Sequence, residues 1–339
     1  MIEFLDKYDT LIFDMDGVIT SESAYWDAAA LTVREFLTDK QFFGNRDIDV
    51  KSMTETVKTI RKEIFLDDRL IAFFKGMGVN SNWDLGYITV LVSLVIGTSD
   101  AEKIYEYAQT IEGTALEAYD TLAELASQKT GADFEDYRRN GKLWRDMCDA
   151  FQSWYLGDVL FEETYGRAPH KAGKTGLYKN EKPVIALDKL KSLLLELSKT
   201  KRLCIATGRL YNEIVPLLEM WGVADFFDKN GICNYNHVIE ADRELGKQFT
   251  KPHPYMFLKA LYGLDYPNKK LDCGDYDKSK IKTALVVGDA GADLFAARAM
   301  GADFCAVLTG VAGESGRAYF EEQKAEYILH NVGDMSNGN

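Results

Sequence analysis

The chain alternates short apolar runs with amphipathic segments near both of its ends. Thr10 to Phe13 is apolar without the period of a half-exposed strand, which predicts a strand buried on both faces. Beyond about residue 182, strand and helix patterns alternate, which predicts an open parallel sheet with helices on both faces. The expected elements are strands over 203–206, 283–287 and 306–308 and helices over 187–197, 211–221 and 293–300.

The segment between these regions has a helical pattern. Apolar residues recur at helical spacing twice, as Met53, Val57, Ile60 and Ile64 and as Leu116, Tyr119, Leu122 and Leu125. The Gly- and Lys-rich stretch 173–183 predicts a connector. We therefore expect an α/β core with a Rossmann-like parallel sheet, built from residues 1–20 and 182–339. Residues 21–181 are then an inserted, mostly α-helical cap domain.

Composition narrows the function classes. A formal net charge of −13 over 339 residues argues against nucleic acid or an anionic membrane as the main partner. Five scattered cysteines without a CxxC pair predict neither a zinc site nor a disulfide framework. The first residues lack a signal-peptide apolar region, and the longest apolar stretch, 87–97, is too short to span a bilayer. We expect a cytoplasmic protein without a membrane partner.

Polar residues follow the expected strands directly. Ligands of open parallel sheets bind outside the carboxyl ends of the strands, so we expect these side chains at one rim. Lys251, just before a helix, is expected there as well. The strand-end groups are Asp14 and Asp16 after the first strand, Thr207, Gly208 and Arg209 after the second, and Asp289 with Asp293 after the strand over 283–287.

These groups suit phosphoryl transfer. Three crowded carboxylates repel one another unless a hard dication binds them, and Mg²⁺ prefers such oxygen ligands. Asp14 can attack phosphorus and also bind the metal. Asp16 can protonate the leaving alkoxide and then activate the water that hydrolyses the acyl phosphate. Gly17 lets the backbone approach the phosphate closely.

A second set of groups can hold the phosphoryl oxygens as charge develops on them. These are the Thr207 hydroxyl, the Gly208 amide and the Lys251 ammonium. For Arg209 the sequence leaves two interpretations open, contact with a substrate carboxylate and simple exposure to solvent.

Four segments, DMDGVIT, ATGR, KPHP and GDAGAD, together resemble the motifs of the haloacid dehalogenase (HAD) superfamily in their order. They are similar to the phosphatase branch with a helical cap after the first motif, as in phosphoglycolate phosphatase-like and β-phosphoglucomutase-like proteins. The resemblance covers residues 1–20 and about 182–315. It implies Asp14 as nucleophile, Asp16 as acid/base with its main-chain carbonyl on the metal, Thr207 and Lys251 as phosphate ligands, and Asp289 and Asp293 as residues serving Mg²⁺.

The activity that the resemblance implies is Mg²⁺-dependent hydrolysis of a small phosphate monoester through an aspartyl-phosphate. A β-phosphoglucomutase-like phosphomutase is an alternative, although those mutases resemble one another in a cap histidine where this chain has Trp26. A non-catalytic HAD-fold binding module is a third reading, which the intact set of catalytic groups disfavours. The expected partner is a small phosphorylated metabolite, and the protein is expected to be a monomer or a homodimer.

One stretch of the cap, NSNWDLGY from Asn80 to Tyr87, is similar to an NxxWDL stretch in the caps of some uncharacterised HAD proteins. It predicts a loop that faces the active site, with Asn82 and Trp83 as substrate contacts. The alternative is that the asparagine caps a helix and the tryptophan packs in the core of the cap.

Overall fold

The chain divides into two compact units in the computed structural model, which describes residues 2–79 and 81–336. Unit 1 comprises Met1–Glu22 and Glu181–Asn339, and unit 2 comprises Ser23–Asn180. These limits differ from the expected ones only at Ser21, Glu22 and Glu181, which lie in unit 1. Each unit has its own hydrophobic core.

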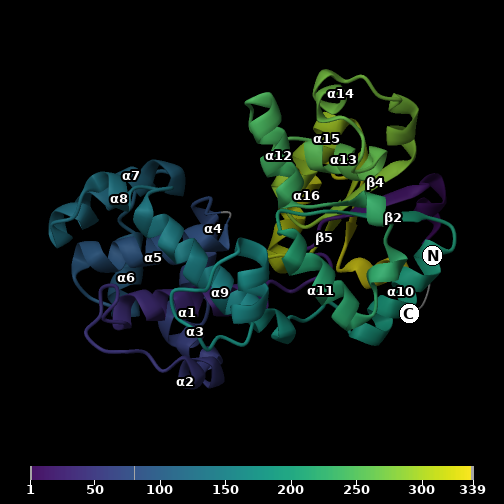
Figure 1. The fold of residues 1–339 in the computed structure, drawn as a ribbon. Helices are drawn as coiled ribbons and strands as arrows, with labels where there is room; N and C mark the ends of the chain where they lie inside the picture. The colour runs from purple at the N-terminus through teal and green to yellow at the C-terminus, as the bar shows by residue number, and fades with distance from the viewer. Residues whose placement is uncertain (1, 80, 337–339) are drawn as a thin grey trace. The chain divides into compact units, whose positions relative to one another are not determined.

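Unit 1 is built on a six-stranded parallel sheet in the order β3-β2-β1-β4-β5-β6, which confirms the predicted fold class (Figure 1). The first strand lies in the middle of this order and pairs with β2 and β4. The sequence pattern did not predict β3 and β6, because they have only two and three residues. The strands are β1 (Thr10–Phe13), β2 (Arg202–Ala206), β3 (Ile232–Cys233), β4 (Ala284–Gly288), β5 (Asp303–Val307) and β6 (Tyr327–Leu329).

The central strand is buried on both faces, as its unbroken apolar run predicts. Successive strand residues point to opposite faces of a sheet. Leu11 and Phe13 accordingly belong to one core cluster, with Leu190 of α10 (Leu187–Ser198), whereas Ile12 belongs to the other, with Phe257 of α13 (Tyr255–Tyr262). Burial on both sides fixes the register of this strand and therefore the position of the residues that follow it.

Helices cover the two faces of this sheet. In Figure 1, α10 and α11 lie on one side of the strands and α13 and α15 on the other. Gly222 and Gly301 end α11 and α15 in the left-handed conformation, as expected for glycine after a helix. The helices of unit 1 are α10 (Leu187–Ser198), α11 (Tyr211–Trp221), α12 (Tyr235–Leu245), α13 (Tyr255–Tyr262), α14 (Asn268–Cys273), α15 (Gly291–Met300) and α16 (Arg317–Glu322).

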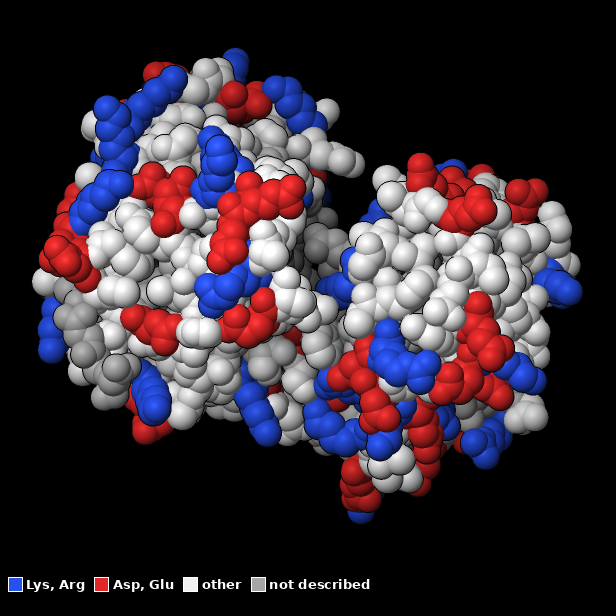
Figure 2. Space-filling model, turned by 180° about the vertical axis from the view of Figure 1, so that it is seen from behind, with Lys and Arg blue, Asp and Glu red and all other residues white. Residues whose placement is uncertain are grey.

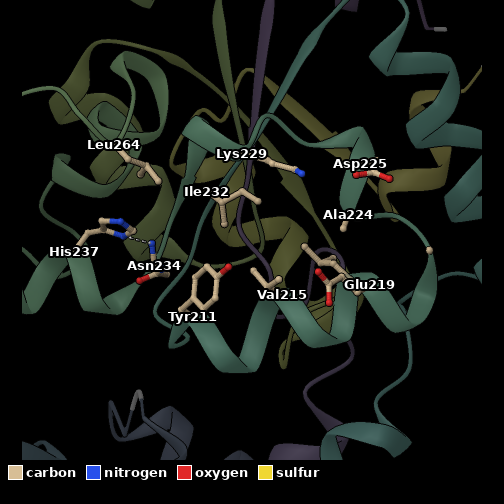
Figure 3. Close-up of a pocket in the computed structure, with 12 residues that line it drawn as sticks. Tyr211, Val215, Glu219, Ala224, Asp225, Lys229, Ile232, Asn234, His237 and Leu264 are labelled. Atoms are coloured by element: carbon tan, nitrogen blue, oxygen red, sulfur yellow. Dashed lines mark hydrogen bonds between the residues drawn. The ribbon is translucent and has the colours of Figure 1, made fainter. Parts of the chain in front are cut away.

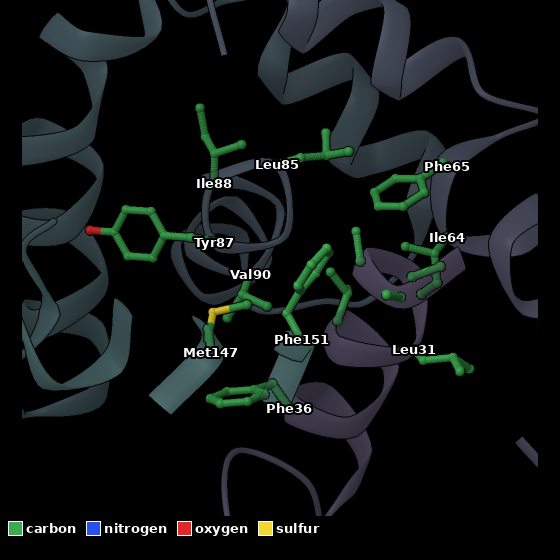
Figure 4. Close-up of a cluster of buried hydrophobic side chains, with 14 of the residues drawn as sticks. Leu31, Phe36, Ile64, Phe65, Leu85, Tyr87, Ile88, Val90, Met147 and Phe151 are labelled. Atoms are coloured by element: carbon green, nitrogen blue, oxygen red, sulfur yellow. The ribbon is translucent and has the colours of Figure 1, made fainter. Parts of the chain in front are cut away.

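Unit 2 is helical, and apolar side chains from α1, α3, α5 and α9 meet in its core (Figure 4). The predicted stripe over 116–125 is wrong in part, since Leu116 is 72% exposed while Ala115 and Ala118 are buried. The helices are α1 (Ser23–Thr38), α2 (Val50–Glu55), α3 (Val57–Phe65), α4 (Arg69–Gly76), α5 (Asn82–Ile96), α6 (Ala101–Ala108), α7 (Ala115–Thr130), α8 (Phe134–Tyr137) and α9 (Lys142–Tyr165).

The stretch 173–183 is more than the connector that its composition predicts. Its first part belongs to unit 2, where the Lys174 side chain is fully buried and paired with Glu35. A lysine in a Gly-rich stretch is usually solvated, so the sequence alone gives no sign of this burial.

The surface carries charges of both signs, and no single described helix has the length and composition of a membrane span. On the face that Figure 2 shows, basic side chains lie among acidic ones on both units. Within residues 2–79 and 81–336, no single helix is long and apolar enough to cross a membrane. The pair α5 and α6 passes that test only when the two are taken together across a 96° bend. Most of α5 is buried in the core of unit 2, as expected for a core helix.

Candidate active site

Three neighbouring strands deliver the predicted site residues to one edge of the sheet. In the register of β1 with its two neighbours, Phe13 pairs with Ile205 of β2 and with Val287 of β4. Asp14 follows directly, and its amide donates to the Val287 carbonyl at 2.8 Å. Because all three strands run parallel, the residues that follow them meet at the same edge.

The carboxylates of Asp14, Asp289 and Asp293 converge there. Each offers an oxygen, and these three oxygens all lie within 4.8 Å of one another. Lys251 joins them, with its ammonium nitrogen 2.8 Å from Asp14 Oδ1 and 2.8 Å from Asp293 Oδ1. The side chains of Lys251 and Asp14 are 12% and 13% exposed, so the group is shielded without being sealed off.

The electrostatics of this cluster favour added positive charge. Burial raises the pKa of Asp14 to about 7; Lys251 lowers it, and the charges of Asp293 and Asp16 raise it. Burial, followed by the charges of Asp293 and Asp14, also raises the pKa of Asp289 well above its usual range. Burial lowers the pKa of Lys251, but the two carboxylates beside it raise it overall, so this side chain stays an ammonium. One ammonium does not balance three carboxylates.

The same residues fit a divalent cation. The buried Asp293 Oδ2 has no hydrogen-bond partner among the described residues. Mg²⁺ takes oxygen ligands in proteins, usually one or two carboxylates together with water and substrate phosphate, and this cluster offers such carboxylates. The backbone also leaves room around the acids, because a Cβ on Gly17 would lie 2.3 Å from Asp289 Oδ2 and one on Gly310 would lie 1.9 Å from it.

Two of the glycines that shape this site were missed in the sequence. A Cβ on Gly288 would lie 2.5 Å from the Asp293 Cβ, and Gly310 packs against Asp289 as described above. Thr309 was missed too, and its hydroxyl donates to the Gly17 carbonyl at 2.5 Å. Their place in the sequence could have indicated them, since Thr309 and Gly310 directly follow an expected strand, as Asp14 and Asp289 do.

The second strand supplies Thr207 and Gly208 to this edge. Thr207 lies two residues beyond Ile205, is fully buried, and its amide donates to the Cys233 carbonyl at 3.1 Å. Its hydroxyl oxygen accepts the Arg209 amide at 3.2 Å. Gly208 is exposed. This strand end therefore presents one buried hydroxyl and one open main-chain segment.

Asp16 and Arg209 form a pair that the sequence did not predict. Arg209 is 2% exposed, and its Nη2 lies 2.5 Å from Asp16 Oδ1. Exposure to solvent, one of the two interpretations that the sequence leaves open, is wrong, because the Arg209 guanidinium is buried against the Asp16 carboxylate. Contact with a substrate carboxylate stays a prediction. The sequence around Arg209 does not show whether the side chain binds an acid of the protein, a substrate or solvent.

The turn that carries Lys251 is ordered by local hydrogen bonds. The His253 amide donates to the Thr250 carbonyl at 2.9 Å, and His253 Nδ1 accepts the Tyr255 amide at 3.2 Å at the start of α13. The lysine ammonium also lies 4.9 Å from the centre of the Phe257 ring. His253 is thus a turn residue, and its hydrogen bonds order the segment that carries Lys251.

The cap stretch predicted to face the site is mostly helical. Asn80 lies outside the described residues. Ser81 caps α5 by accepting the Asp84 amide at 3.0 Å, so the expected loop is wrong from Asn82 onward. The Trp83 ring packs edge-on against Trp144 at 6.1 Å between centroids. Substrate contact by Asn82 and Trp83 stays a prediction.

Asp84 has a structural role in unit 2. It is 4% exposed and accepts hydrogen bonds from Arg139 Nε at 3.0 Å and Nη2 at 2.9 Å, and from Trp144 Nε1 at 2.8 Å. These bonds join the start of α5 to the start of α9 and the loop before it.

A pocket of about 470 Å³ lies elsewhere in unit 1, along α11 (Figure 3). Tyr211, Val215 and Ile232 line it, and His237 closes one side by accepting the Asn234 amide at 3.2 Å. None of its lining residues is an acid of the carboxylate cluster. We place the candidate active site at the cluster, because three carboxylates and an ammonium converge there, whereas the residues that line this pocket include none of them.

Comparison with known proteins identifies the family of this chain. A family model described as a haloacid dehalogenase-like hydrolase matches residues 8–301. No curated protein matches the chain. An X-ray structure from the Northeast Structural Genomics Consortium, for which no organism is stated, is 27% identical, with a TM-score of 0.82 over 96% of this chain and 97% of that one.

Two weaker structural similarities belong to the same superfamily or carry a phosphatase name. A HAD hydrolase of family IA, variant 3, from Entamoeba histolytica is 12% identical, with a TM-score of 0.46 over 97% of this chain and 96% of that one. A candidate phosphoglycolate phosphatase from Lactobacillus plantarum is 14% identical, with a TM-score of 0.42 over 97% and 98%.

Proposed function

The chain belongs to the haloacid dehalogenase-like hydrolase family, and we propose that it is a Mg²⁺-dependent phosphatase acting on a small phosphate monoester. One observation carries this proposal: the carboxylate oxygens of Asp14, Asp289 and Asp293 lie within 4.8 Å of one another beside the Lys251 ammonium. Three carboxylates and one ammonium around one point suit a dication and a phosphoryl group together.

Asp14, Asp289, Asp293 and the main-chain carbonyl of Asp16 would hold the metal, whose charge would offset that of the acids and of the phosphoryl oxygens. Asp14 attacks phosphorus, and an aspartyl-phosphate forms as the bond from phosphorus to the ester oxygen breaks. Asp16 gives a proton to the leaving oxygen. It then takes a proton from the water that releases phosphate and restores Asp14.

The phosphoryl oxygens need donors that do not move during the reaction. Lys251 is fixed by its two carboxylate partners, and the Thr207 hydroxyl and the Gly208 amide stand at the end of the neighbouring strand. Donors that are already placed cost no reorganisation when charge develops on the phosphoryl oxygens. The substrate is proposed to be a small phosphorylated metabolite, and the protein to act in the cytoplasm.

The direct test is hydrolysis of p-nitrophenyl phosphate with Mg²⁺, repeated with EDTA. We expect release of p-nitrophenolate with Mg²⁺ alone, and modification of Asp14 by beryllofluoride as an aspartyl-phosphate analogue. A protein that hydrolyses no ester from a panel of phosphorylated metabolites and binds no beryllofluoride would instead be a binding module. Interconversion of sugar phosphates with little phosphate release would identify a mutase.

Replacing Asp16 by Asn is expected to slow hydrolysis most for esters with poor leaving groups. An amide cannot supply the proton, and general acid catalysis contributes roughly 10²–10⁴-fold where the leaving oxygen needs one. The measurement is kcat for alkyl phosphates against kcat for p-nitrophenyl phosphate. Equal slowing for both classes would contradict the proton-donor role.

Metal binding is expected to depend on pH. Asp14 has a folded-state pKa of about 7, above its value of about 3.9 in an unfolded chain. The metal-free folded state therefore binds more protons between these values, and its free energy of unfolding falls as the pH rises through this window. Mg²⁺ competes with the protons, so it should stabilise the fold more at pH 8 than at pH 5.5.

The measurement for this effect is the melting temperature in EDTA and in Mg²⁺ at both pH values. The increase caused by Mg²⁺ should be larger at pH 8. The Asp14→Asn variant, which lacks the titrating carboxyl, serves as control and should show less pH dependence. An equal increase at both pH values in the unmodified protein would show that Asp14 does not compete with protons for the metal.

A further inference from the structure

Arg209 makes a set of buried contacts for which the proposed reaction gives no role. Its Nε lies 3.1 Å and 3.2 Å from the two carboxylate oxygens of Asp16, and its Nη2 lies 2.5 Å from Oδ1. The guanidinium thus binds the carboxylate with two nitrogens at once. Contacts of this kind fix direction as well as distance, because the planar fork matches the planar carboxylate.

The same guanidinium reaches the two places where the chain leaves unit 1 and returns to it. Nη2 donates to Thr20 Oγ1 at 2.8 Å and lies 3.6 Å from Glu181 Oε1. Thr20 Oγ1 lies in turn 3.1 Å from Asp16 Oδ1. The side chains of Arg209 and Glu181 are 1% and 0% exposed, so these charges are held together away from water.

The two chain segments are also joined to each other. Thr20 forms an isolated antiparallel bridge with Pro183. The Ser21 amide donates to the Lys182 carbonyl at 3.0 Å, and the Val184 amide donates to the Ile19 carbonyl at 3.1 Å. We call these two hydrogen-bonded segments, residues 19–21 and 181–184, the crossing. The side chain of Arg209 therefore contacts Asp16 and both segments of the crossing.

We propose that Arg209 is a positioning residue, which fixes the direction of the Asp16 carboxylate and anchors it to the crossing formed by residues 19–21 and 181–184. The role rests on the proposed phosphatase function. Without the guanidinium, the Asp16 side chain can adopt other rotamers, and an acid held away from the leaving oxygen donates its proton less often. Lysine cannot replace it, since an ammonium is a point charge without the fork.

The test compares Arg209→Lys and Arg209→Met with the unmodified protein on p-nitrophenyl phosphate and on an alkyl phosphate. We expect kcat to fall roughly tenfold or more for the alkyl ester and less than threefold for the p-nitrophenyl ester, because only the first needs a placed acid. Thr20→Val, which keeps the shape and removes one hydroxyl, should show a smaller loss of the same kind. Equal loss for both esters, or a change in KM alone, overturns the proposal.

Burial makes Arg209→Met the variant at risk of misfolding, so the melting temperature is measured for each protein, and Arg209→Lys with Thr20→Val carry the comparison if it fails to fold. A second readout needs no turnover: the Nε–H signal of Arg209 in a nitrogen-15 NMR spectrum. It should be protected from exchange, disappear in Arg209→Lys and shift in Asp16→Asn.

These readouts separate the two hypotheses. An unmodified protein that keeps the protected signal but hydrolyses no ester rejects the phosphatase and the positioning role together. An active protein whose Arg209 variants lose both esters equally rejects the positioning role alone. An active protein without a protected signal shows that the guanidinium does not hold Asp16 in solution.

Discussion

Replacing Asp14 by Asn is expected to abolish turnover, with kcat lower by roughly four orders of magnitude or more. The amide keeps the size of the side chain but cannot attack phosphorus, so no aspartyl-phosphate can form. The measurement is phosphate release under saturating substrate and Mg²⁺. Beryllofluoride should no longer modify the protein, since the acceptor oxygen is gone.

Loss of fold is not expected to explain this result. The Asp14 carboxylate is held among other acids, and its removal relieves repulsion while costing one ion pair with Lys251. The melting temperature in EDTA should therefore be close to that of the unmodified protein. Asp225→Asn makes the same chemical change at an exposed position of unit 1 and should leave kcat unchanged. Retained turnover in Asp14→Asn would remove the covalent mechanism.

The parts of the fold that the sequence predicts are those where one local signal dominates. Thr10 to Phe13 contains no charged residue and only one polar one, Thr10, and the strand has the predicted limits. Helix α11 ends where Gly222 allows the left-handed conformation. By contrast, β3 has only the two residues Ile232 and Cys233, so its pairing depends on tertiary contacts that no window of sequence contains.

Within unit 2, the prediction for α7 was wrong in part because it relied on large apolar residues. The buried face of α7 is formed partly by alanines, which leave room for close packing, while Leu116 is 72% exposed. A search for large apolar residues at helical spacing therefore finds a face rotated from the true one. In the core of a helical domain, small residues at contact positions carry as much information as leucines.

The acids of the candidate site could be predicted because the topology of a parallel sheet determines where they lie. Parallel strands place the residues after them at one edge, so Asp14 and Asp289 converge although 275 positions separate them (289 − 14). The ion pair of Arg209 with Asp16 could not be predicted, because the sequence indicates a catalytic role for Asp16 but does not indicate which cation balances its charge. The direction of a buried side chain depends on contacts that strand order does not fix.

Lys174 gives the largest expected effect on stability. Its ammonium is fully buried and donates to Glu35 Oε2 at 2.9 Å and to Ser153 Oγ at 2.8 Å. Trp154 Nε1 donates to the same Glu35 oxygen at 2.7 Å, and the ammonium lies 4.5 Å from the centre of the Trp154 ring. Lys174→Met would keep the length of the side chain but leave the Glu35 carboxylate buried without its cation.

The segment that carries this lysine packs where α9 is broken. Gly157 has φ 78° and ψ 165° inside the helix, and a Cβ there would lie 2.7 Å from the Gly176 amide nitrogen. The Asp158 amide donates to the Lys174 carbonyl at 3.0 Å. The ion pair therefore holds the last part of unit 2 against α1, while the Ser153 and Trp154 contacts join the same group to α9. Loss of the lysine should loosen both contacts.

We expect Lys174→Met to lower the free energy of unfolding of unit 2 by about 3–5 kcal/mol, the usual cost of leaving a buried charge unpaired. Adding Glu35→Gln should restore much of this loss, because an apolar or neutral pair avoids the burial of charge. Urea denaturation of the two single variants and the double variant measures the coupling.

The matched control is Lys171→Met, since Lys171 pairs with Asp39 at 2.7 Å but is 24% exposed. Its partner Asp39 is also buried, but it keeps its hydrogen bonds from the Gln41 and Ile48 amides, so the loss should be smaller than for Lys174→Met. Equal losses for the two lysines, or a double variant no more stable than Lys174→Met, would mean that the buried pair does not hold this segment in place.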